Sequence, residues 1–374
     1  MLETEAVREL QSTGKEKLSA STSLFLDILR ILAACIVFAV HFLHLLQFPL
    51  GDASGRLGQG AVIVFFVLSG FVIAYSTNAM STGRKYVVSR LSRLYSVVAP
   101  ALVLTAVLLF VGERINPSAY SAVLRGSEWP RLALSAVFLQ NSLKFSAAPT
   151  TNGPFWSLSY EFWYYCLFGA FLFIRAKWLK YAGLALIAIL ICPNILLLLP
   201  CWLAGVVAFR LSKRLSFAVW TASAGFFLAS LASICAFAFS PDLPMQLGKP
   251  PFYFSNRFLT DWVCSILLGL AILFFDQMRL GAVKAHVHSR VRLIADHTFS
   301  LYLYHYPILL FFSALFASHL ASYPAKFAVG LATLALVGLL SIYTEGKRNW
   351  WRKMFDGIWG FAERKVAIGK VTSN

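Results

Sequence analysis

The sequence has few charged side chains, and acidic ones are the scarcer kind. Only 13% of its 374 residues are charged, and 16 acidic residues face 33 basic ones. Hydrophobic residues make up 59% of the chain, and the mean hydropathy is +0.70, which excludes an ordinary soluble domain. We therefore predict an all-α polytopic membrane helix bundle and interpret the net charge of +17 as a topology signal, with no nucleic acid as partner.

The chain also lacks paired cysteines and a recognisable leader. Its six cysteines lie in or beside apolar runs without CxxC or metal-ligand spacing, so we interpret them as packing residues and predict no metal site. The N-terminal segment 1–22 is polar and carries both signs of charge, unlike a cleavable signal peptide. We expect this segment to stay cytoplasmic and the first apolar run to direct insertion.

We identify ten apolar runs as long enough to cross a bilayer, which takes about 17 to 25 residues. They cover residues 24–46, 58–76, 94–112, 156–174, 178–193, 195–210, 215–239, 259–275, 297–318 and 325–343. An eleventh candidate, 132–142, is too short to cross and ends in Gln140 and Asn141. We predict about ten transmembrane helices plus one short re-entrant segment at 132–142.

The basic residues support this count. With ten crossings and both termini cytoplasmic, 24 of the 33 Lys and Arg lie on the inner side, eight lie outside, and Arg30 lies within a span. A crossing at 132–142 would move three basic clusters to the wrong side. The predicted membrane domain covers 23–345. The tail, 346–374, mixes Trp and Phe with Lys and Arg, as is typical of an amphipathic helix on the cytoplasmic leaflet.

The first apolar run contains an arginine and a histidine, side chains whose burial in a membrane costs much free energy. Arg30 and His41 lie eleven positions apart, which places them within about 20° on one helix face and about 16 Å apart along its axis. Such residues usually face a bundle interior or a water-filled cavity, so we predict that both face one cavity. Asp27 is three residues from Arg30 and is expected to pair with it. A purely structural ion pair with a packed histidine is the alternative.

Two other motifs are an arginine pair in the inner loop before the 94–112 run and a pair of small residues within the 58–76 run. Arg90 and Arg93 are one helical turn apart, where they could be topology signals or bind phosphate oxygens bidentately. Ser69-Gly70 is a small pair that favours close helix packing.

Glu161 and His305 are further polar residues in apolar surroundings. Glu161 follows the start of the 156–174 run, where a carboxylate could cap the helix and gain from its dipole. His305 lies inside the 297–318 run beside Pro307, which loosens the local backbone bonding.

Six motifs in fixed order resemble one known family. They are Arg30-x10-His41, FFVLSGF at 65–71, Arg90-x-x-Arg93, LQN at 139–141 leading to WSLSYE at 156–161, SLYLYHYP at 300–307, and Tyr343 with Glu345. Together they resemble the integral-membrane acyltransferase family 3, whose members acylate polysaccharides, lipopolysaccharide and lipid-linked sugars. The resemblance extends over nearly 320 residues.

The resemblance implies a multi-pass enzyme of the bacterial cytoplasmic membrane. It would transfer an acyl group, most often acetyl, from acyl-coenzyme A to a hydroxyl of a glycan or lipid-linked sugar. Acyl-coenzyme A is then a co-substrate, and no permanently bound cofactor is expected. In that family the first-span Arg and His are the functional pair, which corresponds here to Arg30 and His41. No further domain is recognisable after the membrane part, so we expect transfer to finish within the bundle.

We assign roles on that basis as hypotheses. His41 is the general base, because histidine is the side chain best suited to that task near neutral pH. Arg30 is the second member of the catalytic pair and holds the donor phosphates together with the phosphate-binding residues Arg90 and Arg93. We expect Asp27, Glu161 and His305 to support catalysis or bind the acceptor. The alternative function is a multi-pass transporter or flippase of a small anionic or glycan substrate, for which no inverted repeat is visible.

Overall fold

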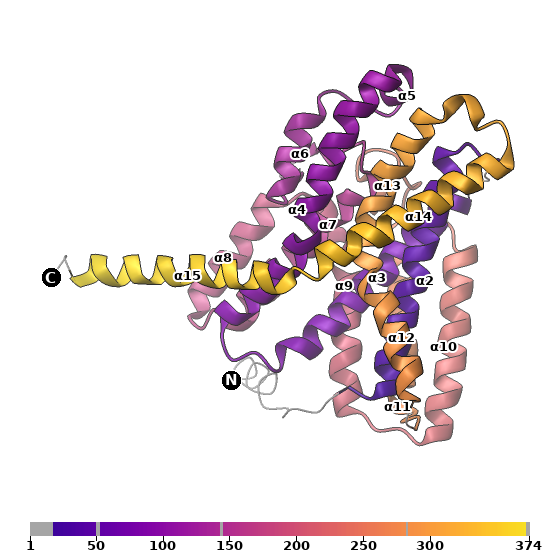
Figure 1. Cartoon of the computed structure of the whole chain (residues 1–374). Coiled ribbons are helices and arrows are strands. Elements are labelled where there is room, and N and C mark those ends of the chain that lie inside the picture. The colour runs from indigo at the N-terminus through magenta and orange to yellow at the C-terminus, as the bar shows by residue number, and fades with distance from the viewer. Residues whose placement is uncertain (1–17, 50–52, 143–144, 282, 372–374) are drawn as a thin grey trace.

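The computed structural model describes residues 18–49, 53–142, 145–281 and 283–371. Most of the predicted cytoplasmic segment 1–22 lies outside these ranges. The described chain is a bundle of long helices with one small hairpin, which confirms the all-α prediction (Figure 1).

Each of the ten predicted runs corresponds to a helix. These helices are α2 (Ala20–Leu45), α3 (Ala53–Thr77), α4 (Gly83–Ile115), α7 (Trp156–Phe173), α8 (Lys177–Leu190), α9 (Pro193–Arg214), α10 (Val219–Phe239), α11 (Phe258–Gln277), α13 (Thr298–Leu315) and α14 (Tyr323–Glu345). Eight helical stretches of the described chain are long and apolar enough to cross a membrane, and α7 and α8 fall outside that set. The protein is thus a multi-pass membrane helix bundle.

The candidate segment 132–142 does not cross. It begins inside α6 (Glu128–Ala136), a nine-residue helix, and ends in β1 (Asn141–Ser142), which pairs antiparallel with β2 (Phe145–Ser146). Nine helical residues rise about 14 Å, less than half of the roughly 30 Å hydrocarbon core. The other connecting elements are α5 (Pro117–Ser121), α12 (Ala285–Asp296) and the short 3-10 turns Gly153–Phe155, Tyr253–Ser255 and Ala317–His319.

Close packing of α3 against α9 forms the centre of the bundle. A Cβ atom on Gly70 would overlap the carbonyl oxygen of Trp202, and one on Gly205 would overlap that of Val67. Only glycine allows two backbones to approach this closely, which confirms the packing interpretation of the Ser69-Gly70 pair. Helix α3 also packs on α2, which in turn packs on α13 (Figure 1).

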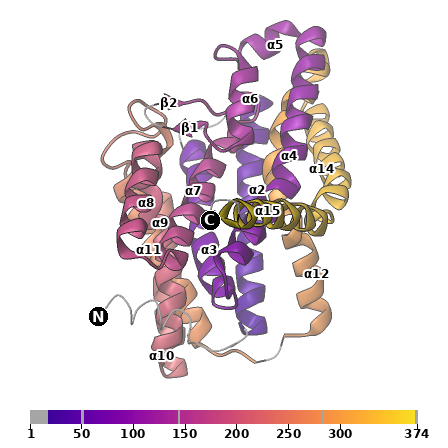
Figure 2. The same cartoon turned by 90° about the vertical axis from the view of Figure 1, so that its left-hand side faces the viewer.

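The last helix, α15 (Arg348–Val371), lies across the bundle. It projects sideways from the end of α14 in Figure 1 and is seen nearly end-on in Figure 2. It packs on α4, and its sequence is amphipathic, in agreement with the helix predicted for the tail.

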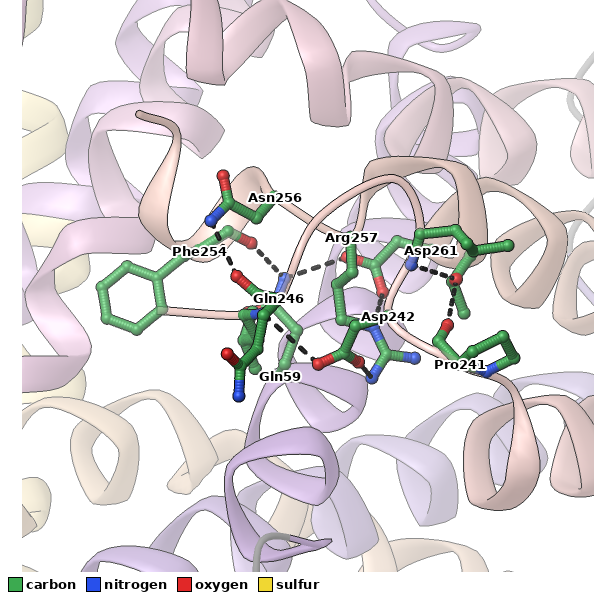
Figure 3. A network of polar contacts seen from close by, with 11 residues as sticks. Gln59, Pro241, Asp242, Gln246, Phe254, Asn256, Arg257 and Asp261 are labelled. Atoms are coloured by element: carbon green, nitrogen blue, oxygen red, sulfur yellow. Dashed lines mark hydrogen bonds and ion pairs between the residues drawn. The ribbon is translucent and has the colours of Figure 1, made fainter. Parts of the chain in front are cut away.

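A buried ionic network fixes the connection between α10 and α11 (Figure 3). The Arg257 guanidinium, only 1% exposed, contacts Asp242 Oδ1 at 3.0 Å and Asp261 Oδ1 at 3.1 Å. Gln59 on α3 donates to Asp261 Oδ2 at 3.1 Å and to the Phe254 carbonyl at 2.8 Å. These charges are paired and hydrogen-bonded, so we interpret the network as structural.

Candidate active site

A cavity of about 940 Å³ opens where α2 and α4 begin and where α14 ends. Five arginines line it, namely Arg30, Arg90, Arg93, Arg292 and Arg348. Four carboxylates also line it, namely Asp27, Glu161, Asp296 and Glu345. Five of the residues singled out in the sequence, Asp27, Arg30, Arg90, Arg93 and Glu161, thus meet around one space.

Asp27 holds two of the arginines in place. Its Oδ1 lies 3.3 Å from Arg30 Nη1, as the three-residue spacing predicts, and its Oδ2 lies 3.3 Å from Arg292 Nη1 on α12. The Asp27 side chain is only 3% exposed, and that of Arg30 is 15% exposed. Arg292 has a second carboxylate partner, because its Nε lies 3.3 Å from Asp296 Oδ1, whereas Arg30 has Asp27 as its ion-pair partner within the described residues.

Arg90 and Arg93 come from the first turns of α4. Arg90 is buried, lies over the Tyr86 ring at 5.7 Å, and donates from Nη2 to Ser76 Oγ at 3.1 Å. Its Nε is buried and has no hydrogen-bond partner. Within the described ranges, Arg90 and Arg93 form no ion pair with a carboxylate. Both guanidinium groups are therefore available to donate hydrogen bonds to an anionic ligand.

Glu161 faces the cavity from the first half of α7. It accepts a hydrogen bond from Ser69 at 2.9 Å and another from Tyr165, and Trp202 Nε1 donates to Ser69 at 3.2 Å. The carboxylate is thus fixed by side chains from α3 and α7. It does not cap its own helix, contrary to the capping alternative, because Glu161 is the sixth residue of α7 and lies beyond the uncapped first turn.

His41 and His305 are directly bonded to each other. The Nδ1 of His41 lies 3.0 Å from Nε2 of His305, and the Nδ1 of His305 lies 2.7 Å from the Leu301 carbonyl. A carbonyl can only accept, so His305 Nδ1 carries a proton and its Nε2, when neutral, is an acceptor. His41 Nδ1 must then donate, and this assignment leaves the lone pair of neutral His41 on Nε2.

Arg30 and His41 lie at different depths along α2, and only Arg30 lines the cavity. This corrects the prediction that both residues face one cavity. On α2 the cavity lining ends at Arg30, and on α13 it ends at Tyr302, one turn before His305. Eleven residues of helix put about 16 Å between Arg30 and His41, which takes His41 past the last lining residues. Tyr302, bonded to Ser157 at 2.7 Å, lies between the cavity and the histidine pair along α13.

Comparison with known proteins shows the family of this chain. A family model described as an acyltransferase domain, Acyl_transf_3, matches residues 23–343. The chain belongs to this acyltransferase family. Residues 23–343 contain the histidine pair and every predicted site residue.

A curated relative supports the same family. The acyltransferase MdmB of Streptomyces mycarofaciens is 31% identical over 175 residues, a match that covers 42% of this chain and 42% of the relative. The match thus spans less than half of the relative's length. No solved structure matches the chain.

Sequence reasoning missed three cavity residues of this acyltransferase family member. Arg292 and Arg348 were counted only among the basic residues of the inner side, and His297 only as the first residue of the 297–318 run. Only their positions in the sequence could have indicated a place in the cavity, because each lies near the end of a span on the side where Arg90 and Arg93 lie. Tyr165, which bonds Glu161, had no signal apart from its place one turn after that residue.

Proposed function

We propose that this protein is a membrane O-acyltransferase that uses acyl-coenzyme A, with acetyl as the acyl group. The acceptor is a hydroxyl of a cell-surface or exported glycan, or of a lipid-linked sugar. One arrangement supports this function most strongly: an arginine-lined cavity lies one helical turn from a histidine pair in which His41 Nε2 is free to accept a proton.

The cavity suits the donor. Coenzyme A carries several phosphates on its nucleotide end, and guanidinium groups bind phosphate oxygens with charge-assisted, bidentate hydrogen bonds. Arg30, Arg90 and Arg93 come from two helices and face the same space. With both termini cytoplasmic in a bacterial inner membrane, as the distribution of Lys and Arg favours, this cavity opens to the cytosol, where acyl-coenzyme A is made.

The histidine pair suits the chemistry. In the proposed reaction His41 Nε2 takes the proton of the acceptor hydroxyl as its oxygen attacks the thioester carbonyl carbon. The tetrahedral intermediate then expels the coenzyme A thiolate as the carbon–sulfur bond breaks. The imidazolium of His41 returns the proton to that thiolate, so the base is restored and the acyl group is on oxygen.

His305 has a positioning role in this reaction. Its Nε2 accepts the Nδ1 proton of His41, which keeps the ring in the tautomer and orientation needed for Nε2 to act. Phe38 packs 5.9 Å from the His305 ring and Tyr306 packs edge-on 5.1 Å from the His41 ring, so the pair is enclosed by aromatic side chains.

The decisive experiment uses purified protein in lipid vesicles with acetyl-labelled acetyl-coenzyme A and a glycan acceptor from the host envelope. Label should move to the acceptor, with release of free coenzyme A, only when both substrates are present. Counterflow of an intact substrate across the vesicle without thioester cleavage would contradict this function and favour a transporter.

A further inference from the structure

The start of the C-terminal helix forms part of the cavity wall. Glu345 and Gly346 end α14, and Arg348 begins α15, and all three line the same cavity as Arg30 and Arg93. The Glu345 carboxylate already accepts two hydrogen bonds, from the backbone N–H of Ser300 at 3.0 Å and from its hydroxyl at 2.7 Å. Arg348 is therefore the group from this junction that can meet a ligand.

The helix that carries Arg348 is docked on the helix that carries Arg93. Arg84 on α4 contacts Asp356 at 3.3 Å and Glu363 at 2.9 Å. Two residues after Arg93, the Tyr95 ring lies 5.8 Å from the Trp351 ring and 5.5 Å from the Phe355 ring. These contacts run along three turns of α4 and fix where α15 begins (Figure 2).

The cavity has more positive charge than its carboxylates neutralise. Five arginines line it against four carboxylates: Asp27 contacts Arg30 and Arg292, Asp296 also pairs with Arg292, Glu161 is bonded to hydroxyl groups, and Glu345 is bonded to Ser300. In the part of the chain that the structure describes, no carboxylate forms an ion pair with Arg348. Like charges gathered around one space are compensated when an anion with several charges binds between them.

We propose that α15 is part of the donor site and that Arg348 binds a phosphate of the acyl-coenzyme A nucleotide, together with Arg93. This inference rests on the proposed function and extends it to a residue outside the region matched by the family. The tail then has a role in substrate binding in addition to any contact with the membrane surface.

The test compares two donors in Arg348→Ala. Acetyl-coenzyme A carries the phosphates, and S-acetylpantetheine has the same thioester without them. We expect the KM for acetyl-coenzyme A to rise about tenfold, with kcat kept, because one charge-assisted phosphate contact is lost. The KM for S-acetylpantetheine should not change. Arg352→Ala is the matched control, since Arg352 is an exposed arginine of α15 that does not line the cavity.

The same kinetics separate a coenzyme A phosphate from a lipid phosphate. The assay is run in detergent and in nanodiscs with phosphatidylglycerol. If Arg348 binds lipid, Arg348→Ala changes both donors equally and only with phosphatidylglycerol, which overturns the proposal. An unchanged KM for acetyl-coenzyme A also overturns it.

Binding of coenzyme A itself, measured by titration calorimetry, separates this inference from the proposed function. Weaker binding to Arg348→Ala than to wild type and Arg352→Ala is expected whether or not transfer is detected. Wild-type affinity in Arg348→Ala overturns the role of Arg348 and leaves the proposed function intact. A wild-type protein that binds coenzyme A but transfers no acyl group contradicts only the proposed function.

Discussion

The Nδ1 atom of His41 lies 3.0 Å from the Nε2 atom of His305, a residue 264 positions further along the chain. The Leu301 carbonyl sets the tautomer of His305 and, through it, that of His41. Two histidines on different helices therefore define which nitrogen of His41 can act as a base.

We expect His305→Ala to lower kcat about 100-fold, because His41 loses the acceptor that orients its ring. The KM for acetyl-coenzyme A should stay near the wild-type value, since His305 does not line the cavity. His305→Gln should recover part of kcat, because the glutamine carbonyl can accept the same proton. Steady-state kinetics on protein of confirmed thermal stability measures both, and wild-type kcat in His305→Ala would exclude the positioning role.

The planar guanidinium of Arg30 should matter beyond its charge. Arg30→Lys keeps the positive charge but cannot bind phosphate bidentately, so we expect about tenfold weaker binding of coenzyme A. Arg175→Lys, at an exposed position outside the cavity, is the control. Titration calorimetry reports the affinity. Equal coenzyme A affinities for wild type and Arg30→Lys would show that only the positive charge of Arg30 contributes to binding.

Asp27 should contribute more to the thermal stability of the protein without coenzyme A than to that of the protein with coenzyme A bound. Asp27→Asn leaves Arg30 without its carboxylate partner, while Arg292 is half exposed and keeps its ion pair with Asp296, so we expect a cost of about 1 to 3 kcal/mol. Coenzyme A should then raise the Tm of Asp27→Asn more than that of wild type. Thermal unfolding with and without coenzyme A tests this, and equal shifts in both proteins would contradict it.

The network around Arg257 should affect stability and leave donor binding intact. Arg257→Met leaves Asp261 buried without its cation, a change expected to cost about 3 to 5 kcal/mol. A lower Tm with wild-type coenzyme A affinity below that temperature is the expected pattern. Weakened coenzyme A binding by folded Arg257→Met would instead connect this network to the donor cavity.

The sequence predicts helices better than it predicts where polar side chains meet. Each of the ten predicted apolar runs corresponds to a helix, because the bilayer constrains length and composition strongly, but α7 and α8 lie outside the described helices that are long and apolar enough to cross a membrane. The Asp27 and Arg30 pair is also predictable, since both residues lie within one turn of one helix. Arg90 and Arg93 are predictable as a pair for the same reason.

Contacts between distant helices carry no such local signal. The bond between His41 and His305, the sharing of Asp27 with Arg292, and the place of Arg348 depend on how α2, α12, α13 and α15 pack. The depth of the cavity depends on the same packing. The prediction that His41 lines it was wrong, because periodicity fixes the face of a helix and not how far along that face a cavity extends.

The most direct test of the account is single-turnover acetyl transfer by His41→Ala, measured beside its coenzyme A affinity. Because His41 is proposed as the base and lies beyond the donor cavity, we predict that transfer falls about 1000-fold while coenzyme A binds as tightly as to wild type. Transfer within about tenfold of wild type by His41→Ala would contradict the account, since general-base catalysis is expected to contribute more than that.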